Sequence, residues 1–158
     1  MEKNNSAFSL KACLALLRPK QWIKNLFVFS PLVFSGSFTD AETVIAATVA
    51  MVLFCVASSS VYIINDYHDI EKDRLHPVKS QTRPLASGAV SKSTALVLLA
   101  VLLGFLFVGG YFLTAALPII ILYFFINILY TFYLKHQPVI DIFTIATGFV
   151  LRVYAGAM

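Results

Sequence analysis

Charged residues are scarce in this sequence: Asp, Glu, Lys and Arg together make up only 13% of its 158 residues. A soluble domain usually carries about 25% charged residues. The chain is also 59% hydrophobic, with a mean hydropathy of +0.81. This composition excludes an ordinary soluble domain and predicts an integral membrane protein.

Cysteine is rare as well, since Cys13 and Cys55 are the only two. They indicate no disulfide framework, and we expect both to be free thiols. A cleavable signal is not expected either, because Lys11 interrupts the apolar stretch from Phe8 to Leu17 and no small-residue cleavage site follows. The net charge of +4 could suggest a nucleic-acid partner, but the positions of the basic residues described below argue against one.

Long uncharged runs predict an all-α fold, a polytopic transmembrane helical bundle that forms one membrane domain over residues 1–158. About five spans are expected, at residues 25–39, 43–65, 93–113, 117–134 and 138–158. The first is the least regular, because an α-helix of this length reaches only about 22 Å, short of a membrane core of about 30 Å. Gly109-Gly110 and Pro118 predict a tight hairpin between the third and fourth spans.

Local signals indicate where several helices begin and end. Ser9 is a candidate cap for a short helix over Leu10–Leu17, which Pro19 would stop. Ser91 or Ser93 is expected to cap the third span. Pro138 occupies a favoured first position for the last one.

The basic residues are distributed asymmetrically along these spans. Eleven of the twelve Lys and Arg residues lie in residues 1–24, in residues 72–92, or at Lys135. With alternating spans these three places share one side of the membrane, and the opposite connections contain none. The positive-inside rule therefore predicts a multi-pass protein of the plasma (inner) membrane, with a cytoplasmic basic segment at 1–24 and a cytoplasmic loop at 66–92.

The second span ends in an acidic motif, Asn65-Asp66-Tyr67-His68-Asp69-Ile70-Glu71-Lys72-Asp73. If one helix continues through it at about 100° per residue, Asn65, Asp66, Asp69 and Asp73 share one narrow face. Carboxylates crowded in this way repel one another unless a cation lies among them. Mg²⁺, which prefers oxygen ligands and shares the phosphates of substrates, is the expected cation.

The loop that follows is polar and contains Pro77, Pro84 and Gly88, so we expect it to lie outside the membrane. Lys79 and Arg83 within it offer cations to phosphate oxygens. Ordinary positive-inside charge or attraction to anionic lipid headgroups is the alternative explanation for these two residues. Beside a metal-binding face, contact with a Mg²⁺–diphosphate is the favoured interpretation, and the loop is expected to be part of the active site.

The motif Asn65-Asp66-x-x-Asp69-x-x-x-Asp73 resembles the first aspartate-rich motif of the UbiA-type membrane prenyltransferases. Two further segments, Arg18-Pro-Lys-Gln-Trp-Ile-Lys-Asn25 and His76-Pro-x-Lys79-x-x-x-Arg83-Pro-Leu-Ala-Ser-Gly88, resemble the decaprenyl-phosphate phosphoribosyltransferase branch of that superfamily. The resemblance implies Mg²⁺-dependent transfer of a phosphoribosyl group from 5-phosphoribosyl 1-diphosphate to a polyprenyl phosphate, with release of pyrophosphate, in cell-envelope synthesis. It also implies catalysis by Asp66, Asp69 and Asp73, with Asn65 joining these three as metal ligands. Phosphate contacts are implied for Lys24, Asn65, Lys79 and Arg83.

Family members of this type have about nine spans and a second aspartate-rich motif, whereas Asp141 is the only acid after Asp73 here. The chain is therefore expected to resemble the N-terminal half of such an enzyme, with a separately encoded second half as one expected partner. Two alternatives remain open at this point. One is a prenyltransferase that moves a polyprenyl group from its diphosphate to an aromatic acceptor, and the other is a catalytically silent membrane subunit or fragment.

Four further polar residues lie near or within the spans. Asp141 is expected to be a helix-start acid favoured by the helix dipole, and His68 and His76 to be loop residues rather than ligands. Arg152 falls about 16 Å beyond Asp141 along a helix, near the middle of the membrane. A charge there should face protein or water, and with no acid at that depth in the sequence we expect its partner to lie in the second half.

Overall fold

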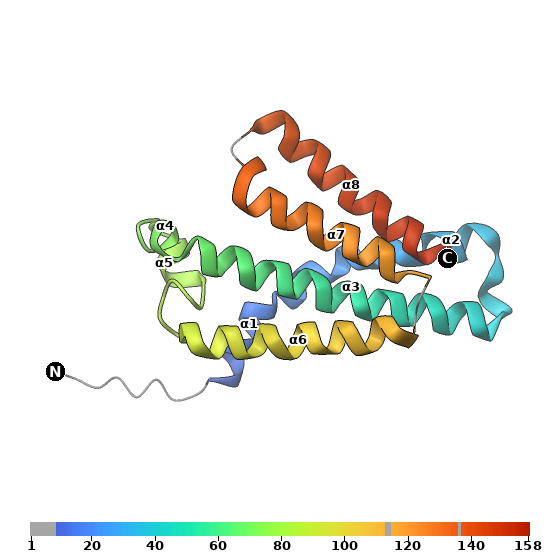
Figure 1. Ribbon diagram of the computed structural model, residues 1–158, viewed down its shortest axis with the longest axis horizontal. Helices are drawn as coiled ribbons and strands as arrows, with labels where there is room; N and C mark the ends of the chain where they lie inside the picture. The colour runs from blue at the N-terminus through green and yellow to red at the C-terminus, as the bar shows by residue number, and fades with distance from the viewer. Residues whose placement is uncertain (1–8, 113–114, 136) are drawn as a thin grey trace.

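The computed structural model describes residues 9–112, 115–135 and 137–158. Four of its helices are long and apolar enough to cross a membrane: Ala41–His68, Lys92–Tyr111, Leu117–Leu134 and Val139–Gly156. They lie roughly alongside one another in a helical bundle (Figure 1). The predicted all-α, polytopic membrane fold is thus confirmed.

The central helix is α3 (Ala41–His68). More than half of its most apolar window, 56%, is buried inside the protein, against 11–22% for the other three candidate spans. Helix α6 (Lys92–Phe112) packs along one side of α3, while α7 (Leu117–Leu129) and α8 (Pro138–Gly156) form a hairpin on another side (Figure 1). A short π-helix, η3 (Tyr130–Leu134), extends α7.

The predicted first span, 25–39, is not one continuous α-helix. It begins within a 3₁₀-helix, η1 (Pro19–Phe29), and continues through α2 (Ser30–Ser35) and a 3₁₀ turn, η2 (Ser37–Thr39). A 3₁₀-helix rises about 2 Å per residue, so η1 and α2 together reach about 31 Å, close to the thickness of a membrane core. That length counts Pro19–Ser35, which begins six residues before the predicted span.

Small polar side chains attach η1 to α3. Ser59 Oγ accepts a hydrogen bond from Trp22 Nε1 at 3.0 Å and donates one to the carbonyl oxygen of Leu17 at 2.8 Å. Asn25 Nδ2 donates to Ser58 Oγ at 3.3 Å. On the far side of η1, Gly156 of α8 approaches so closely that a Cβ there would lie 1.7 Å from the carbonyl oxygen of Val28. The 3₁₀ segment is therefore held between α3 and α8.

The predicted helix ends are largely confirmed. Ser9 caps α1 (Leu10–Leu17) by accepting from Ala12 N, and α1 ends just before Pro19. Ser91 accepts from Thr94 N at the start of α6, and α8 begins at Pro138. The tight hairpin is confirmed, since α6 ends at Phe112 and α7 begins at Leu117. Gly109-Gly110 do not break the helix, because both belong to α6, where Gly109 allows close approach to Leu53 of α3.

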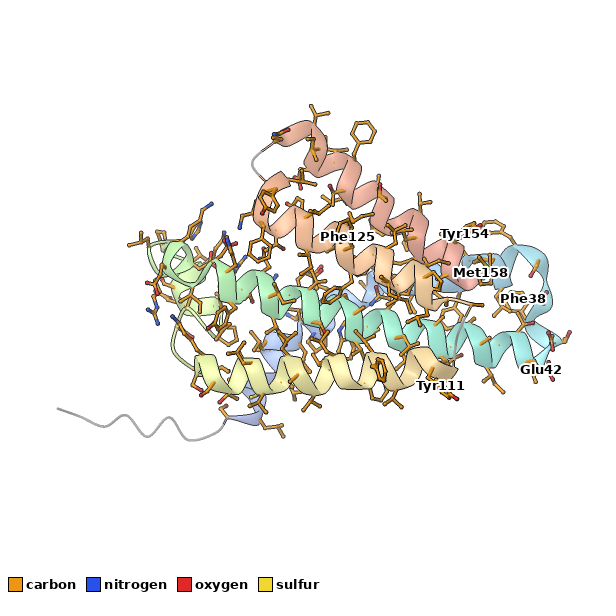
Figure 2. The ribbon with its side chains drawn as sticks, viewed as in Figure 1. Phe38, Glu42, Tyr111, Phe125, Tyr154 and Met158 are labelled. Atoms are coloured by element: carbon orange, nitrogen blue, oxygen red, sulfur yellow. The ribbon has the colours of Figure 1, made fainter. Side chains whose placement is uncertain are left out.

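Large apolar side chains cover much of the outer surface, as expected for a protein embedded in lipid. Phe125 is 58% exposed and Tyr154 57% exposed, and both point outward (Figure 2). The polar segments gather at one end of the bundle, where α4 (Ile70–Arg74), α5 (Lys79–Thr82) and the α7–α8 turn lie (Figure 1). The three basic regions of the sequence therefore meet at the same end, as the charge pattern predicts.

Candidate functional site

The acidic motif does not form the single continuous helix that its spacing predicts. Helix α3 ends at His68, and Asp69 adopts φ −94° and ψ 9° before α4 begins at Ile70. Asp side chains favour such helix ends because they bond locally and compete with the helical backbone. The break separates the four predicted metal ligands into two groups with different surroundings.

Asp66 and Asp73 form a buried cluster with two arginines. Asp66 Oδ1 lies 2.6 Å from Arg18 Nη2 and 2.9 Å from Arg83 Nη1, and Arg83 Nη1 also lies 2.5 Å from Asp73 Oδ2. Only 2% of Asp66 and 1% of Asp73 is exposed. We call these four residues the arginine–aspartate cluster. It ties the end of α1 to the 66–92 loop.

A further cation, an unpartnered oxygen and a cavity adjoin this cluster. Lys79 Nζ approaches Asp73 Oδ1 at 3.5 Å, and Asp66 Oδ2 is buried without a hydrogen-bond partner among the described residues. A cavity of about 560 Å³ opens beside Arg18, Lys20, Asp66 and Arg83. The predicted phosphate ligands Lys79 and Arg83 are thus near the acidic motif, but in this structure they neutralise its aspartates.

Asn65 and Asp69 lie outside this cluster, and Asp69 pairs with Lys135, which directly follows η3. They are one helical turn apart, since Asp69 N still bonds to the carbonyl oxygen of Asn65 at 3.0 Å. Asp69 Oδ1 lies 2.5 Å from Lys135 Nζ and 3.1 Å from His68 Nδ1. The Asn65 side chain is half-buried and makes no hydrogen bond within the part of the chain that the structure describes. We call this pair the Asn65–Asp69 face.

The surroundings of Asp69 favour its charged form. Burial raises the pKa of Asp69, but hydrogen bonds and charge contacts with Lys135 and His68 outweigh it, so the pKa lies below the usual 3.8. Asp69 is therefore an anion at neutral pH. Its outer position and single ammonium partner leave it more accessible to a ligand than Asp66 or Asp73.

The four ligands predicted from the spacing do not form one protein-only metal centre. Across residues 9–112, 115–135 and 137–158, no group of three or more His, Cys, Asp and Glu side chains is placed to hold a metal ion. In this structure Asp66 and Asp73 pair with arginines and Asp69 with Lys135, so a Mg²⁺ site shared by all four residues with substrate phosphates stays a prediction.

A second cavity, of about 180 Å³, lies deeper in the bundle, between η1, α3, α7 and α8. We call it the deep pocket. Its polar lining side chains include two cations and three tyrosines: Lys24, Tyr62, Tyr123, Asn127, Tyr130, Thr144 and Arg152. Tyr62 also faces Arg18, whose guanidinium carbon lies 4.9 Å from the ring centroid. Tyr62 thus stands between the deep pocket and the arginine–aspartate cluster.

Arg152 has partners within the chain, contrary to the expectation that they would lie elsewhere. Its Nε donates to Asn25 Oδ1 at 2.7 Å, Nη1 to the Gly148 carbonyl at 2.6 Å, and Nη2 to Tyr123 Oη at 3.2 Å. Its guanidinium also lies 4.9 Å from the Tyr123 ring centroid. Neutral dipoles and aromatic rings, rather than an acid, therefore hold this charge.

The remaining polar residues have local roles. His76 Nδ1 accepts from the backbone N–H of Val78 and of Lys79, which agrees with its predicted place in the loop. Asp141 lies in the first turn of α8 and accepts from Tyr130 Oη at 2.7 Å. Arg18 and Lys135 contact the acidic motif but were not among the predicted site residues. Arg18 belongs to a segment that resembles the family, whereas the only signal for Lys135 was its charge.

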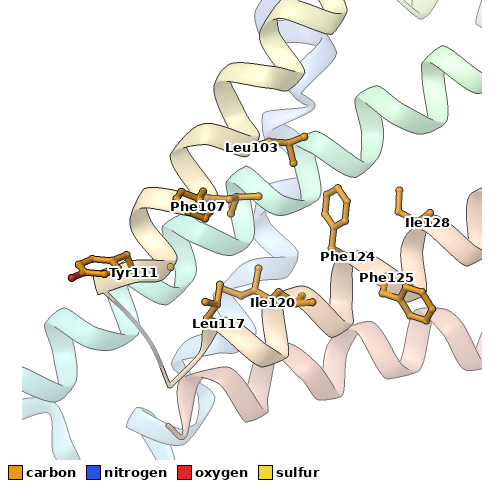
Figure 3. Close-up of a pocket in the computed structure, with 11 residues that line it drawn as sticks. Leu103, Phe107, Tyr111, Leu117, Ile120, Phe124, Phe125 and Ile128 are labelled. Carbon is orange, nitrogen blue, oxygen red and sulfur yellow. The ribbon is translucent and has the colours of Figure 1, made fainter.

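An apolar groove separates α6 from α7 (Figure 3). It measures about 590 Å³ and includes Leu103, Phe107, Leu117, Ile120 and Phe124 among its lining residues. Such a groove suits a hydrocarbon chain.

Comparison with known proteins places this architecture in a family. The model of the UbiA prenyltransferase family matches residues 26–158. The chain belongs to this family. Because the match covers all four candidate spans, the UbiA assignment applies to the bundle as a whole.

Several relatives are named decaprenyl-phosphate phosphoribosyltransferase, and three of them are described here. The protein from Mycolicibacterium smegmatis is 42% identical to this chain over 147 residues. The protein from Corynebacterium glutamicum is 38% identical over 150 residues, and the one from Mycobacterium tuberculosis is 35% identical over 147 residues. Each alignment covers 90% of this chain but only 46%, 44% and 48% of the respective relative. The UbiA chain described here thus spans about half the length of the curated relatives it matches.

Proposed function

We propose that this chain provides the donor site for transfer of a phosphoribosyl group from 5-phosphoribosyl 1-diphosphate to a polyprenyl phosphate, with release of pyrophosphate. The observation that carries the proposal is the accessible Asn65–Asp69 face, with Lys135 at its edge and a cation-lined pocket beneath it. The names of the related proteins support the same donor and acceptor classes. The product would serve cell-envelope polysaccharide synthesis.

Mg²⁺ fits this face as part of a metal–diphosphate. The Asn65 amide oxygen and the Asp69 carboxylate are hard oxygen ligands one turn apart, and the Asn65 amide has no partner among the described residues. Mg²⁺ commonly takes only one or two protein ligands and completes its coordination with water and phosphate oxygens. When bound, it would stabilise the negative charge that builds on the departing pyrophosphate.

Asp66 and Asp73 have a different part in this proposal. Their carboxylates already bind Arg18 and Arg83, and together they are almost completely buried. They fix the two guanidinium groups at the edge of the 560 Å³ cavity, where these cations can contact diphosphate oxygens. Lys79, at 3.5 Å from Asp73, is placed to do the same.

The chemical step needs positioning and charge stabilisation more than proton transfer. A phosphate-monoester oxygen attacks the anomeric carbon of the ribose, and the bond to the diphosphate oxygen breaks with its electron pair leaving on pyrophosphate. The acceptor is already an anion, so no strong general base is required. Lys135, Arg18 and Arg83 supply fixed positive charge around the leaving group, where its charge develops.

Membrane orientation follows from the same geometry. The basic N-terminal segment, the 66–92 loop and Lys135 meet at one end of the bundle, which we propose faces the cytoplasm across the plasma membrane. The water-soluble ribosyl donor would then enter from the cytoplasm. The lipid acceptor would keep its hydrocarbon tail in the bilayer.

Pyrophosphate release from membranes tests the proposed reaction. Because the chain spans about half of its relatives' length, the assay is run with the chain alone and with the C-terminal half of a related enzyme co-expressed. We expect release with 5-phosphoribosyl 1-diphosphate and a polyprenyl phosphate. Release only with an isoprenoid diphosphate and an aromatic acceptor would instead identify a prenyltransferase. No release with either pair would indicate a silent subunit.

A further inference from the structure

The deep pocket contains a buried positive charge without a negative partner. Only 6% of Arg152 is exposed, and its three hydrogen bonds go to a side-chain amide, a backbone carbonyl and a phenol. No carboxylate lies within ion-pair distance of it among the described residues. A buried guanidinium is normally paired with an anion, since its desolvation is otherwise uncompensated.

Several hydrogen-bond donors remain available around this charge. A guanidinium carries five N–H groups, and the three bonds of Arg152 leave two of them without a partner among the described residues. The Tyr123 hydroxyl accepts from Arg152 and keeps its own proton to donate. Lys24 makes neither an ion pair nor a hydrogen bond within the described part of the chain, although it lines the same cavity.

Acidic groups are missing from the lining of this pocket. Of the acids near lining residues, Asp141 already accepts from the hydroxyl of Tyr130, and Asp66 is already paired with Arg18 and Arg83. Two cations and unoccupied donors without a facing carboxylate form an environment that attracts an anion. Phosphate is one of the anions that guanidinium and ammonium groups commonly bind in proteins.

The deep pocket also lies next to the proposed donor site. Tyr62, which lines the pocket, is on α3 one turn before Asn65 and Asp66. One turn of helix is about 5.4 Å. An anion in the pocket would therefore be a neighbour of a diphosphate held at the Asn65–Asp69 face, on the side of the membrane interior.

We propose that the deep pocket is a phosphate-monoester subsite in which Lys24 and Arg152 hold the phosphate of the lipid acceptor. This assignment rests on the proposed function for the choice of acceptor, and the position of the pocket among α3, α7 and α8 favours a lipid source over a soluble one. The same chemistry would also accept the phosphate of a soluble sugar phosphate. The test must therefore distinguish the two sources.

Binding to the purified chain in lipid nanodiscs provides the test, with farnesyl phosphate, ribose 5-phosphate and uncharged farnesol as probes in calorimetric titrations. The Lys24→Gln variant removes an exposed cation that has no protein partner, so folding should be unaffected. We expect farnesyl phosphate to bind wild type and to bind Lys24→Gln about tenfold more weakly. Lys11→Gln, an exposed lysine on α1 outside both pockets, is the matched control and should bind as wild type does.

Arg152→Gln should weaken the binding of farnesyl phosphate further. The thermal melting of this variant is recorded as well, because Arg152 also contacts η1. Equal binding by wild type and Lys24→Gln, or equal binding of farnesol and farnesyl phosphate, would overturn the subsite. Lys24-dependent binding of ribose 5-phosphate without binding of farnesyl phosphate would overturn the lipid assignment.

The titrations contain no Mg²⁺ and no ribosyl donor. Farnesyl phosphate binding that persists in Asp69→Asn would therefore support the subsite even if the donor site itself failed.

Discussion

Asp66 and Asp69 are three residues apart in one motif, yet their side chains have different environments. Asp66 is enclosed by Arg18 and Arg83, whereas Asp69 lies at the outer edge of the bundle beside Lys135. Residue type and spacing alone assign both to one metal face. In the structure Asp66 pairs with two arginines and Asp69 with Lys135, and we propose that Asp69 is the carboxylate that binds a ligand.

Replacing Arg83 should therefore destabilise the fold. Arg83→Met leaves Asp66 and Asp73 buried close together with less positive charge, and we expect a loss of about 3–5 kcal/mol in the free energy of unfolding. Arg74→Met, which removes an exposed ion pair with Glu71, is the control and should cost no more than about 1 kcal/mol. Denaturant titration in mild detergent measures both. Equal losses in the two variants would contradict the arginine–aspartate cluster as a structural anchor.

Lys135 should control the ionisation of Asp69. The folded-state pKa of Asp69 lies below 3.8, so its contact with Lys135 stabilises the folded state fully above pH 3.8. This stabilisation is lost as the pH falls through the folded-state pKa. In Lys135→Met the raising effect of burial is no longer balanced by the ammonium group, so the pKa should increase. Carboxyl ¹³C NMR of labelled aspartate follows this titration. An unchanged pKa would show that Lys135 does not govern this carboxylate.

At the scale of single elements, η1 is the least conventional part of the fold. Runs of 3₁₀-helix longer than three or four residues are uncommon, and η1 has 11. Its side chains bond to Ser58 and Ser59 of α3, while Gly156 of α8 packs against its backbone. Tertiary contacts on two sides thus favour a geometry that local preference does not.

Gly156→Ala should disrupt this packing. A Cβ at residue 156 would lie 1.7 Å from the Val28 carbonyl oxygen, and because this is backbone, α8 must move away from η1. We expect a loss of about 1–3 kcal/mol or more. Gly104→Ala in α6, where a Cβ meets nothing within 4 Å, is the matched control and should be neutral or slightly stabilising. Unfolding of both variants in mild detergent checks the difference, and a neutral Gly156→Ala would contradict the close contact.

The sequence predicts elements well where the signal is local. Ser9, Ser91 and Pro138 mark helix starts correctly because each acts on the backbone within a few residues. The partners of Arg152 could not be predicted in this way, since Asn25 is 127 residues distant in sequence. Nor could the end of α3 before Asp69, because helical spacing alone does not show where a helix stops.

At the scale of the whole molecule, charge and topology agree. Every lysine and arginine except Arg152 belongs to segments that the charge pattern assigns to one side of the membrane. The aspartates of the acidic motif form ion pairs with Arg18, Lys79, Arg83 and Lys135. The other end carries Asp40 and Glu42 at the start of α3. A bundle of this kind has a defined orientation in the membrane.

Cysteine labelling tests that orientation. Cys13 and Cys55 are buried, so a bulky polar reagent should not label them. Single exposed cysteines can then be introduced at Gln81 or Thr39. We expect a membrane-impermeant maleimide added outside intact cells to label Thr39→Cys and to leave Gln81→Cys unlabelled until the cells are opened. The reverse pattern would place the acidic motif outside the cytoplasm.

The central claim is that the Asn65–Asp69 face binds the ribosyl donor together with Mg²⁺. Calorimetric titration of the nanodisc-embedded chain with 5-phosphoribosyl 1-diphosphate, with and without Mg²⁺, tests it most directly. Binding should require Mg²⁺ in the wild type, disappear in Asp69→Asn, and persist in Glu71→Gln, an exposed acid of the same motif. Binding that is equal in Asp69→Asn and Glu71→Gln, or no Mg²⁺-dependent binding even with a complementing C-terminal half, would contradict the claim.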